Sequence, residues 1–480
     1  MDWCLIFNKN SLHNVSLLCL KALEMSLTSS FLDKQRTIAQ PGFNRWLIPP
    51  AALFIHLCIG QVYAFSVFNL PMTKLIGITT TAPKDWNLAT LGWIFSSAIA
   101  FLGISAALFG KWVERVGPRK AMFVSALCFS SGFFVSALGV YLHQIVLVYL
   151  GYGVLGGVGL GIGYISPVST LIRWFPDRPG MATGMAIMGF GGGAIIGSPL
   201  AVTLMDHFKS PTSVGVWQTF VVMGVIYLVM MMCGVFLVRI TPPDWKPKGY
   251  TPPQKPKKLV TTASISADNA IKTPQFWLLW IVLCTNVTAG IGVLSQASPM
   301  IQEMFKVSAA AGAGFVVLLS LFNMAGRFFW SSVSDHIGRK RTYMIFFGLG
   351  MALYALIPTT GKLGNIGLFY IGFCIILSMY GGGFATIPAY LRDLFGTMQV
   401  GAIHGRLLTA WSVAGVLGPV LVNYIREFQI NHGVPKTEAY TITMYVMVGV
   451  LLIGFIANLL IEEVHIKYHH NVIDEYSRTS

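Results

Sequence analysis

Charged residues are scarce in this chain. They make up only 11% of its 480 residues, whereas hydrophobic residues make up 54%. Soluble globular domains carry about 25% charged residues, so this chain lacks the polar side chains that would cover a water-exposed surface. The shortage excludes a soluble globular protein, and we expect a membrane protein that is not an enzyme.

Paired cysteines are also missing. The seven cysteines are scattered and none is spaced C-x-x-C. We interpret them as small buried hydrophobic residues. They predict neither a disulfide framework nor a metal site, and nothing in the sequence calls for a cofactor.

The N-terminus has no signal-peptide pattern. Residues 1–45 mix apolar and polar residues without a clear apolar core or cleavage site. Met25 opens a polar stretch that is typical of a cytosolic lead-in. We expect residues 1–24 to come from an upstream start codon.

Long apolar segments dominate the rest of the chain, and about 20 apolar residues span a ~30 Å hydrocarbon layer as a helix. No alternating strand pattern indicates a membrane β-barrel. We therefore expect an all-α membrane protein with twelve transmembrane helices, near 47–71, 89–110, 121–141, 145–172, 181–205, 215–239, 275–302, 309–333, 342–360, 365–391, 399–425 and 440–461.

The net charge of +15 has a topological explanation. Twelve spans place both termini on one side, and the loops on that side hold seventeen Lys and Arg against seven on the other. Positive charge concentrates in cytosolic loops. The sequence thus predicts cytosolic termini in the cell (inner) membrane, without a nucleic-acid partner.

The two halves of the chain repeat each other. Glu114 and Gly117 recur as Asp335 and Gly338, 221 residues later, and Gly161 recurs as Gly382. Such a repeat predicts two six-helix bundles with a substrate path between them. We divide the chain into an N-terminal segment 1–45, a first bundle 46–240, a flexible Pro- and Lys-rich cytosolic linker 241–272, a second bundle 273–463 and a cytosolic tail 464–480.

The repeated acid-x-x-Gly loops (114–120 and 335–341) resemble the signature loop of the major facilitator superfamily, which implies the major facilitator fold. Within that superfamily, the stretches 173–177, 273–277 and 326–330 resemble the oxalate/formate antiporter family, a relative of the monocarboxylate transporters. The resemblance runs from about residue 44 to 462. From the signature loops we expect Glu114, Arg115, Asp335 and Arg339 at a cytosolic gate or mouth.

Arg327 is the best candidate for a substrate-binding residue. It lies inside the eighth span, about two turns from Asp335, and a buried arginine is costly unless it is paired. A guanidinium grips a carboxylate through two parallel hydrogen bonds. The family resemblance implies the same role, while an arginine that snorkels or pairs structurally is the alternative.

Carboxylates are absent from the middle of every span. The related monocarboxylate transporters carry an Asp one turn before their arginine, where this chain has Asn323, which cannot titrate. This favours anion exchange or facilitated transport over obligate proton symport. His56 in the first span is a possible proton carrier, although we favour a hydrogen-bonded structural histidine.

The second cation of the antiporter family is also missing. The resemblance places that family's lysine at Trp411 of this chain. His404 shares a helical face with Trp411, roughly two turns or ~10 Å away. We expect His404 and Arg406 at the cytosolic mouth, where they attract anions or, alternatively, act as a gate or tether a loop.

Aromatic residues match the positions of a substrate-enclosing ring in the antiporter family. An aromatic wall suits a small planar carboxylate; packing or interface anchoring is the alternative for each residue taken singly. The expected ring is Tyr63, Tyr164, Phe190, Tyr380 and Phe384. With Arg327, Trp411 and Asn323 it makes up the expected substrate-binding set.

Together these features predict a secondary transporter for a small carboxylate, with a monocarboxylate favoured, that works by alternating access as an exchanger or facilitator. The partners we expect are a small carboxylate anion and the lipid bilayer, with the monomer as the functional unit. Two alternatives remain open: export of a larger amphipathic compound, and a non-transporting carboxylate sensor.

Overall fold

A computed structural model describes residues 30–250, 259–261 and 263–469. Twelve helical segments in this part of the chain are long and apolar enough to cross a bilayer. Apart from two isolated β-bridges, the regular structure in these ranges is helical. The all-α prediction is confirmed. The expectation for residues 1–24 and the last part of the predicted tail, 470–480, fall outside the described residues.

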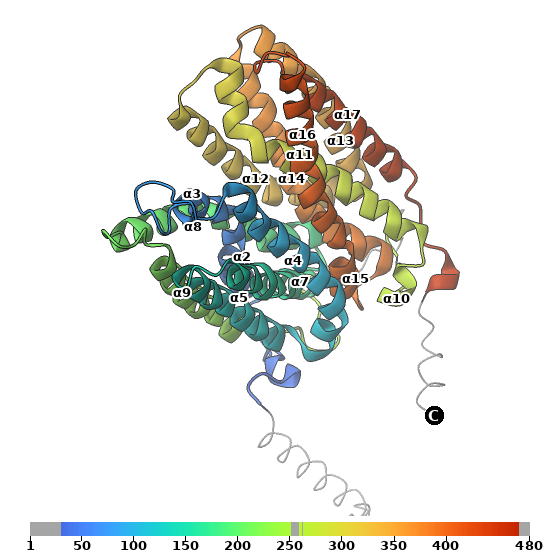
Figure 1. Cartoon of the computed structure of the whole chain (residues 1–480). Coiled ribbons are helices and arrows are strands. Elements are labelled where there is room, and N and C mark those ends of the chain that lie inside the picture. Colours follow the sequence, from blue (N-terminus) through green and yellow to red (C-terminus); the bar gives the residue numbers. More distant parts are fainter. Residues whose placement is uncertain (1–29, 251–258, 262, 470–480) are drawn as a thin grey trace, which may run out of the picture.

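The first six spans contain the helices of the blue-to-green half of Figure 1. They are α2 (Ile48–Ile59), η3 (Gly60–Phe68) and α3 (Asn69–Met72) in span one, α4 (Leu88–Val116), α5 (Pro118–Tyr141), then α6 (Ile145–Val148), η4 (Tyr149–Gly156) and α7 (Gly157–Trp174) in span four, α8 (Pro179–Phe208) and α9 (Val216–Leu237).

The last six spans form the yellow-to-red half, which packs beside the first (Figure 1). They are α11 (Pro274–Phe305), α12 (Ala309–Ile337), α13 (Arg339–Lys362), α14 (Ile366–Phe395), α15 (Val400–Leu407) with α16 (Thr409–Asn431) in span eleven, and α17 (Thr441–Leu459).

Helix ends follow local chemistry. Thr273 caps α11 by accepting a hydrogen bond from the Phe276 N–H, and Pro274 follows at the first helical position. Gly117 and Gly338 follow α4 and α12 with φ of +84° and +90°. Only glycine adopts such a conformation without strain, which explains why the signature loop needs its glycine in both halves.

Span one is wound unevenly. After α2 it tightens into the 3-10 segment η3, a geometry that often marks a functional hinge. Gly60 opens this segment against the Phe190 carbonyl of α8, so close that a Cβ at Gly60 would collide with it. The tightened segment carries Tyr63 and brings it toward α8.

The two bundles meet in two places. In one, α8 packs against α12 and α14; in the other, α4 packs against span eleven, which consists of α15 and α16. Small residues allow the close approach, since a Cβ on Gly184 would meet Ser331 and one on Gly405 would meet the Ala106 carbonyl. We call the end of the molecule that carries the 241–272 linker the linker side; the charge distribution predicts that it is cytosolic.

Two segments on the linker side are more ordered than the sequence suggests. Residues of the N-terminal lead-in pair with the end of the first bundle, where Ala39 N–H donates to the Ile240 carbonyl at 3.0 Å. The linker also pairs with α14, because Ile265 N–H donates to the Phe395 carbonyl at 3.0 Å. The C-terminal part of the linker, which includes the short helix α10 (Ala267–Ala270), therefore packs against the second bundle.

Candidate functional site

Arg327 lies on α12, fully buried where the two bundles meet. Its Nε donates to Asn323 Oδ1, one turn earlier, at 3.3 Å, and Nη1 donates to the Ile187 carbonyl of the other bundle at 3.4 Å. Nη2 has no hydrogen-bond partner among the described residues. These two bonds leave Nη2 available for another acceptor.

No counter-charge accompanies this guanidinium. None of the ion pairs among the described residues includes Arg327. Asn323 occupies the place one turn away where a carboxylate would neutralise it, and an amide oxygen accepts a hydrogen bond without supplying charge. A buried, uncompensated cation is costly unless an anion joins it.

The aromatic residues expected from the sequence come together around Trp411. Its ring centroid lies 4.5 Å from that of Phe384, 5.3 Å from Phe190 and 5.5 Å from Tyr164. Tyr63 lies 5.2 Å from Phe190, and Tyr380 packs on Phe384 at 5.3 Å. Both bundles therefore contribute to one cluster.

Arg327 adjoins this aromatic cluster. Its Cζ lies 5.2 Å from the Phe384 centroid and 5.7 Å from the Phe190 centroid, one ring from each bundle. Both distances are within the range of cation–π attraction. The rings hold the guanidinium in place without neutralising its charge.

The polar atoms of the cluster share one deficiency. The hydroxyls of Tyr63, Tyr164 and Tyr380, the Trp411 Nε1 and the Arg327 Nη2 are buried without a hydrogen-bond partner among the described residues. All of them donate, and the indole and guanidinium nitrogens can only donate. Because unpaired buried donors are costly, the indole and guanidinium nitrogens call for an acceptor, and the guanidinium favours an anionic one.

His56 lies beside the cluster, on α2. Its ring is 5.4 Å from that of Tyr164, and both ring nitrogens face main-chain carbonyls, those of Ala186 and Tyr164. A neutral imidazole has one N–H and can donate to one of these carbonyls, which fits the structural alternative, while the role of His56 as a proton carrier stays a prediction.

His404 and Arg406 separate although they are two residues apart on α15. The His404 ring is buried and lies 5.8 Å from the Tyr164 ring, so it adjoins the aromatic cluster rather than an open mouth. Arg406 donates to the Ala267 carbonyl and to Asp268 Oδ1 at 2.7 Å. Arg406 therefore tethers α10, which agrees with the loop-tethering role that was the alternative to attracting anions.

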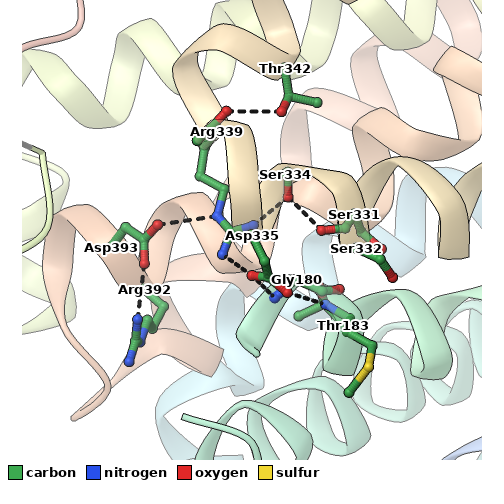
Figure 2. Close-up of polar contacts among 12 residues, drawn as sticks. Gly180, Thr183, Ser331, Ser332, Ser334, Asp335, Arg339, Thr342, Arg392 and Asp393 are labelled. Carbon is green, nitrogen blue, oxygen red and sulfur yellow. Dashed lines mark hydrogen bonds and ion pairs between the residues drawn. The ribbon is translucent and has the colours of Figure 1, made fainter. Parts of the chain in front are cut away.

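Two acidic residues close the linker side symmetrically. Glu114 Oε1 accepts the Gly401 N–H at 2.9 Å, and the two Asp335 oxygens accept the N–H groups of Gly180 and Met181, each at 2.9 Å. In both cases an acid at the end of one bundle caps a helix of the other, where the helix dipole favours negative charge. We call these contacts the two latches, and Figure 2 shows the one at Asp335.

Arginines secure both latches. Arg339 joins Asp335 at 2.5 Å and Asp393 at 3.1 Å (Figure 2). Glu114 is bound by Arg173, whose Nη2 also donates to the Met398 carbonyl across the interface. Arg115, which the sequence suggested for the gate, is exposed, so the arginine that serves Glu114 is Arg173.

The sequence interpretation missed the glycines of the latches. Gly180 and Gly401 are separated by the same 221 residues that relate Glu114 to Asp335. A Cβ on Gly401 would lie 2.6 Å from Glu114 Oε1. The repeat offset was the available signal, but a glycine has no side chain that marks it as part of a gate.

A family model described as Major Facilitator Superfamily matches residues 52–419. The chain belongs to the major facilitator superfamily. It is thus a multi-pass membrane protein of a transporter family, as the helix count and the repeat predicted.

Relatives within the major facilitator superfamily are similar over most of their length. The oxalate:formate antiporter of Oxalobacter formigenes is 27% identical, over 78% of this chain and 83% of its own. An uncharacterized MFS-type transporter of Escherichia coli, YhjX, is 25% identical over 78% and 86%. Apicoplast pyruvate carrier 1 of Toxoplasma gondii is 22% identical over 74% and 78%.

The fold of this major facilitator protein is also found in solved structures. A bacterial homologue of the iron transporter ferroportin, in an outward-facing state, superposes with a TM-score of 0.62. The match covers 86% of this chain and 98% of the other at 15% identity.

Proposed function

We propose that the protein is a secondary transporter for a small carboxylate, with monocarboxylates preferred, and that Arg327 binds the carboxylate. The observation that carries the proposal is the buried guanidinium with a free Nη2 and no ion-pair partner among the described residues. A carboxylate supplies both the missing negative charge and the missing acceptors. Two parallel hydrogen bonds to one guanidinium are a strong and geometrically selective way to hold it.

The preference for a single charge follows from charge counting. Arg327 neutralises one carboxylate, and Trp411 stands where the antiporter resemblance places a second cation. The indole and its aromatic neighbours suit an apolar or planar remainder of the ligand. The named substrates of two relatives, oxalate and formate for one and pyruvate for the other, belong to the same chemical class of small carboxylates.

Alternating access fits the distribution of contacts between the bundles. The two latches hold the linker side together, and both are made of hydrogen bonds and ion pairs that can be broken and remade. Both bundles contribute residues to the aromatic cluster, so a rocking motion of the bundles would open the cluster to one side of the membrane and then to the other. Arg327 itself donates across the interface to Ile187, which links the ligand site to that motion.

Transport of labelled acids into proteoliposomes tests the proposal. The purified chain should take up a labelled monocarboxylate such as formate, lactate or pyruvate in exchange for internal substrate, without a pH gradient. Arg327→Lys should abolish most of this uptake at normal membrane abundance, because an ammonium cannot make the two-pronged contact. Arg341→Lys, at an exposed arginine on the linker side, is the matched control.

Two outcomes would contradict the proposal. Unimpaired uptake in Arg327→Lys and in Arg327→Ala would remove the assigned role of the guanidinium. A strict requirement for an acid outer solution during monocarboxylate uptake would contradict the proton-independent exchange inferred from Asn323.

A further inference from the structure

His404 is a buried titratable residue that has no part in the anion binding proposed at Arg327. It is 1% exposed, and neither of its ring nitrogens has a hydrogen-bond partner among the described residues. An unpaired buried polar group costs about 1–3 kcal/mol. Its ring contacts that of Tyr164, which contacts Trp411, so the unpaired nitrogens adjoin the same cluster as the donors around Arg327.

The charged groups on the elements around α15 are engaged elsewhere. On α4, α7, α10 and α14, and at the far ends of α11 and α16, these groups form the ion pairs Glu114–Arg173, Lys111–Asp268, Arg406–Asp268, Arg392–Asp393 and Arg426–Glu303. The remaining two, Arg115 of α4 and Glu427 of α16, are exposed. The titratable groups that act on the His404 ring are Tyr164 of α7, by contact, and His56 of α2, by charge. Among the described residues of these elements, no carboxylate is placed to stabilise a protonated His404.

A ligand bound at Arg327 would change the charge of the cluster that this imidazole adjoins through Tyr164. With a monoanion on Arg327 the cluster is neutral, and a proton on His404 would add an unbalanced charge in a region of low dielectric. With a dianion, Arg327 balances one carboxylate and a full negative charge remains, which favours a proton on a nearby imidazole. A protonated imidazole also has two donors, the kind of group that a second carboxylate binds.

We propose that His404 is a conditional second cation of the anion site, which takes up one proton from solvent when a dicarboxylate binds and none when a monocarboxylate binds. The proposal rests on the carboxylate site proposed at Arg327. It makes His404 a specificity-determining residue: at higher pH the site selects monoanions, and at lower pH it also accepts dianions.

Oxalate and oxamate are the probes that separate charge from shape. Both are small and planar, but oxamate carries an amide in place of one carboxylate, and oxalate stays doubly ionised between about pH 6 and pH 8. Calorimetric titration of the full chain in lipid nanodiscs, repeated in two buffers with different ionisation enthalpies, measures protons taken up on binding. We expect uptake of about one proton when oxalate binds and about none when oxamate binds. The Kd for oxalate should increase by up to about tenfold for each unit by which the pH is raised.

The variant His404→Gln tests the assignment to this residue. It should reduce the pH dependence of the oxalate Kd to that of oxamate, because glutamine cannot take up a proton. His56→Gln is the comparison at the other buried histidine. An oxalate slope that persists in His404→Gln and disappears in His56→Gln would overturn the proposal by moving the proton to His56.

The parent chain alone also decides the question, so the test holds even if a variant fails to fold. Equal proton uptake for oxalate and oxamate would refute the role of His404 and leave the carboxylate site intact. Failure of both ligands to bind, or oxamate binding that survives Arg327→Ala, would instead refute the proposed function.

Discussion

The unpaired charge of Arg327 should make the ligand-free protein less stable than it could be. We consider Arg327→Met, which replaces the guanidinium with an apolar side chain of similar reach. The native arginine keeps only two long hydrogen bonds, at 3.3 and 3.4 Å, and has no ion pair among the described residues. Replacing buried ionic groups with hydrophobic residues of similar volume is neutral or stabilises by about 1–4 kcal/mol. Because Arg327 has no counter-charge that the substitution would leave unpaired, the free energy of unfolding of Arg327→Met should increase.

The same substitution should remove ligand binding. A charge-assisted hydrogen bond contributes about 1.5–3 kcal/mol, so the loss of two corresponds to about 3–6 kcal/mol. This is a more than 100-fold increase in Kd. Arg327→Lys keeps the charge but loses the parallel geometry, and should weaken binding by about 10–100-fold. Stability and binding therefore change in opposite directions in Arg327→Met, as expected of a residue that is kept for function.

Thermal unfolding in nanodiscs, with and without oxamate, checks both statements. The midpoint for Arg327→Met should rise above that of the parent without ligand and should not respond to oxamate. Arg341→Met, at an exposed position, should match the parent in both respects. A lower midpoint for ligand-free Arg327→Met would refute the reasoning, because it would mean that the two hydrogen bonds and the cation–π contacts with Phe384 and Phe190 outweigh the cost of the unpaired charge.

Three further changes test other parts of the molecule. Gly401→Ala should weaken the linker-side closure, because the added Cβ would lie 2.6 Å from Glu114 Oε1. The reaction of a cysteine introduced on the linker side with a thiol reagent should then become faster. It should not change in Gly449→Ala, where a Cβ meets nothing within 4 Å. Trp411→Lys should install a permanent second cation, so that oxalate competes with labelled substrate better than in the parent and does so without pH dependence. The pKa of Asp268 is lowered by hydrogen bonds from two cations, so its contribution to linker docking is present at neutral pH and is lost as the pH falls through that depressed value. Asp268→Asn should therefore increase hydrogen exchange of α10 at neutral pH; unchanged exchange would contradict this.

The helices and the repeat were predictable because they depend on properties that every residue carries. Apolar runs of bilayer length mark the spans, and the offset of 221 residues relates Glu114 to Asp335. The family resemblance then named Arg327 and its aromatic neighbours, and the structure brings them together around Trp411. Their role in binding remains a proposal.

The contacts on the linker side could not be predicted in the same way. Pairing between the Ala39 N–H and the Ile240 carbonyl uses only the main chain, so it leaves no pattern in the side chains. The position of His404 beside Tyr164 depends on how two spans from different bundles face each other, and counting along one helix gives only its distance from Trp411. Arg115 and Arg173 look equivalent as sequence, and the three-dimensional approach of α4 and α7 decides which one meets Glu114.

The two latches have the geometry of an isologous dimer contact. In such a contact one patch is used twice, with residue i of the first unit on residue j of the second and the reverse; here Glu114 meets Gly401 while Asp335 meets Gly180. A single six-helix unit that carried one acid and one glycine would build both latches by pairing with a second copy of itself in the same membrane orientation. The covalent chain thus holds, in one polypeptide, an interface that two identical subunits could have formed.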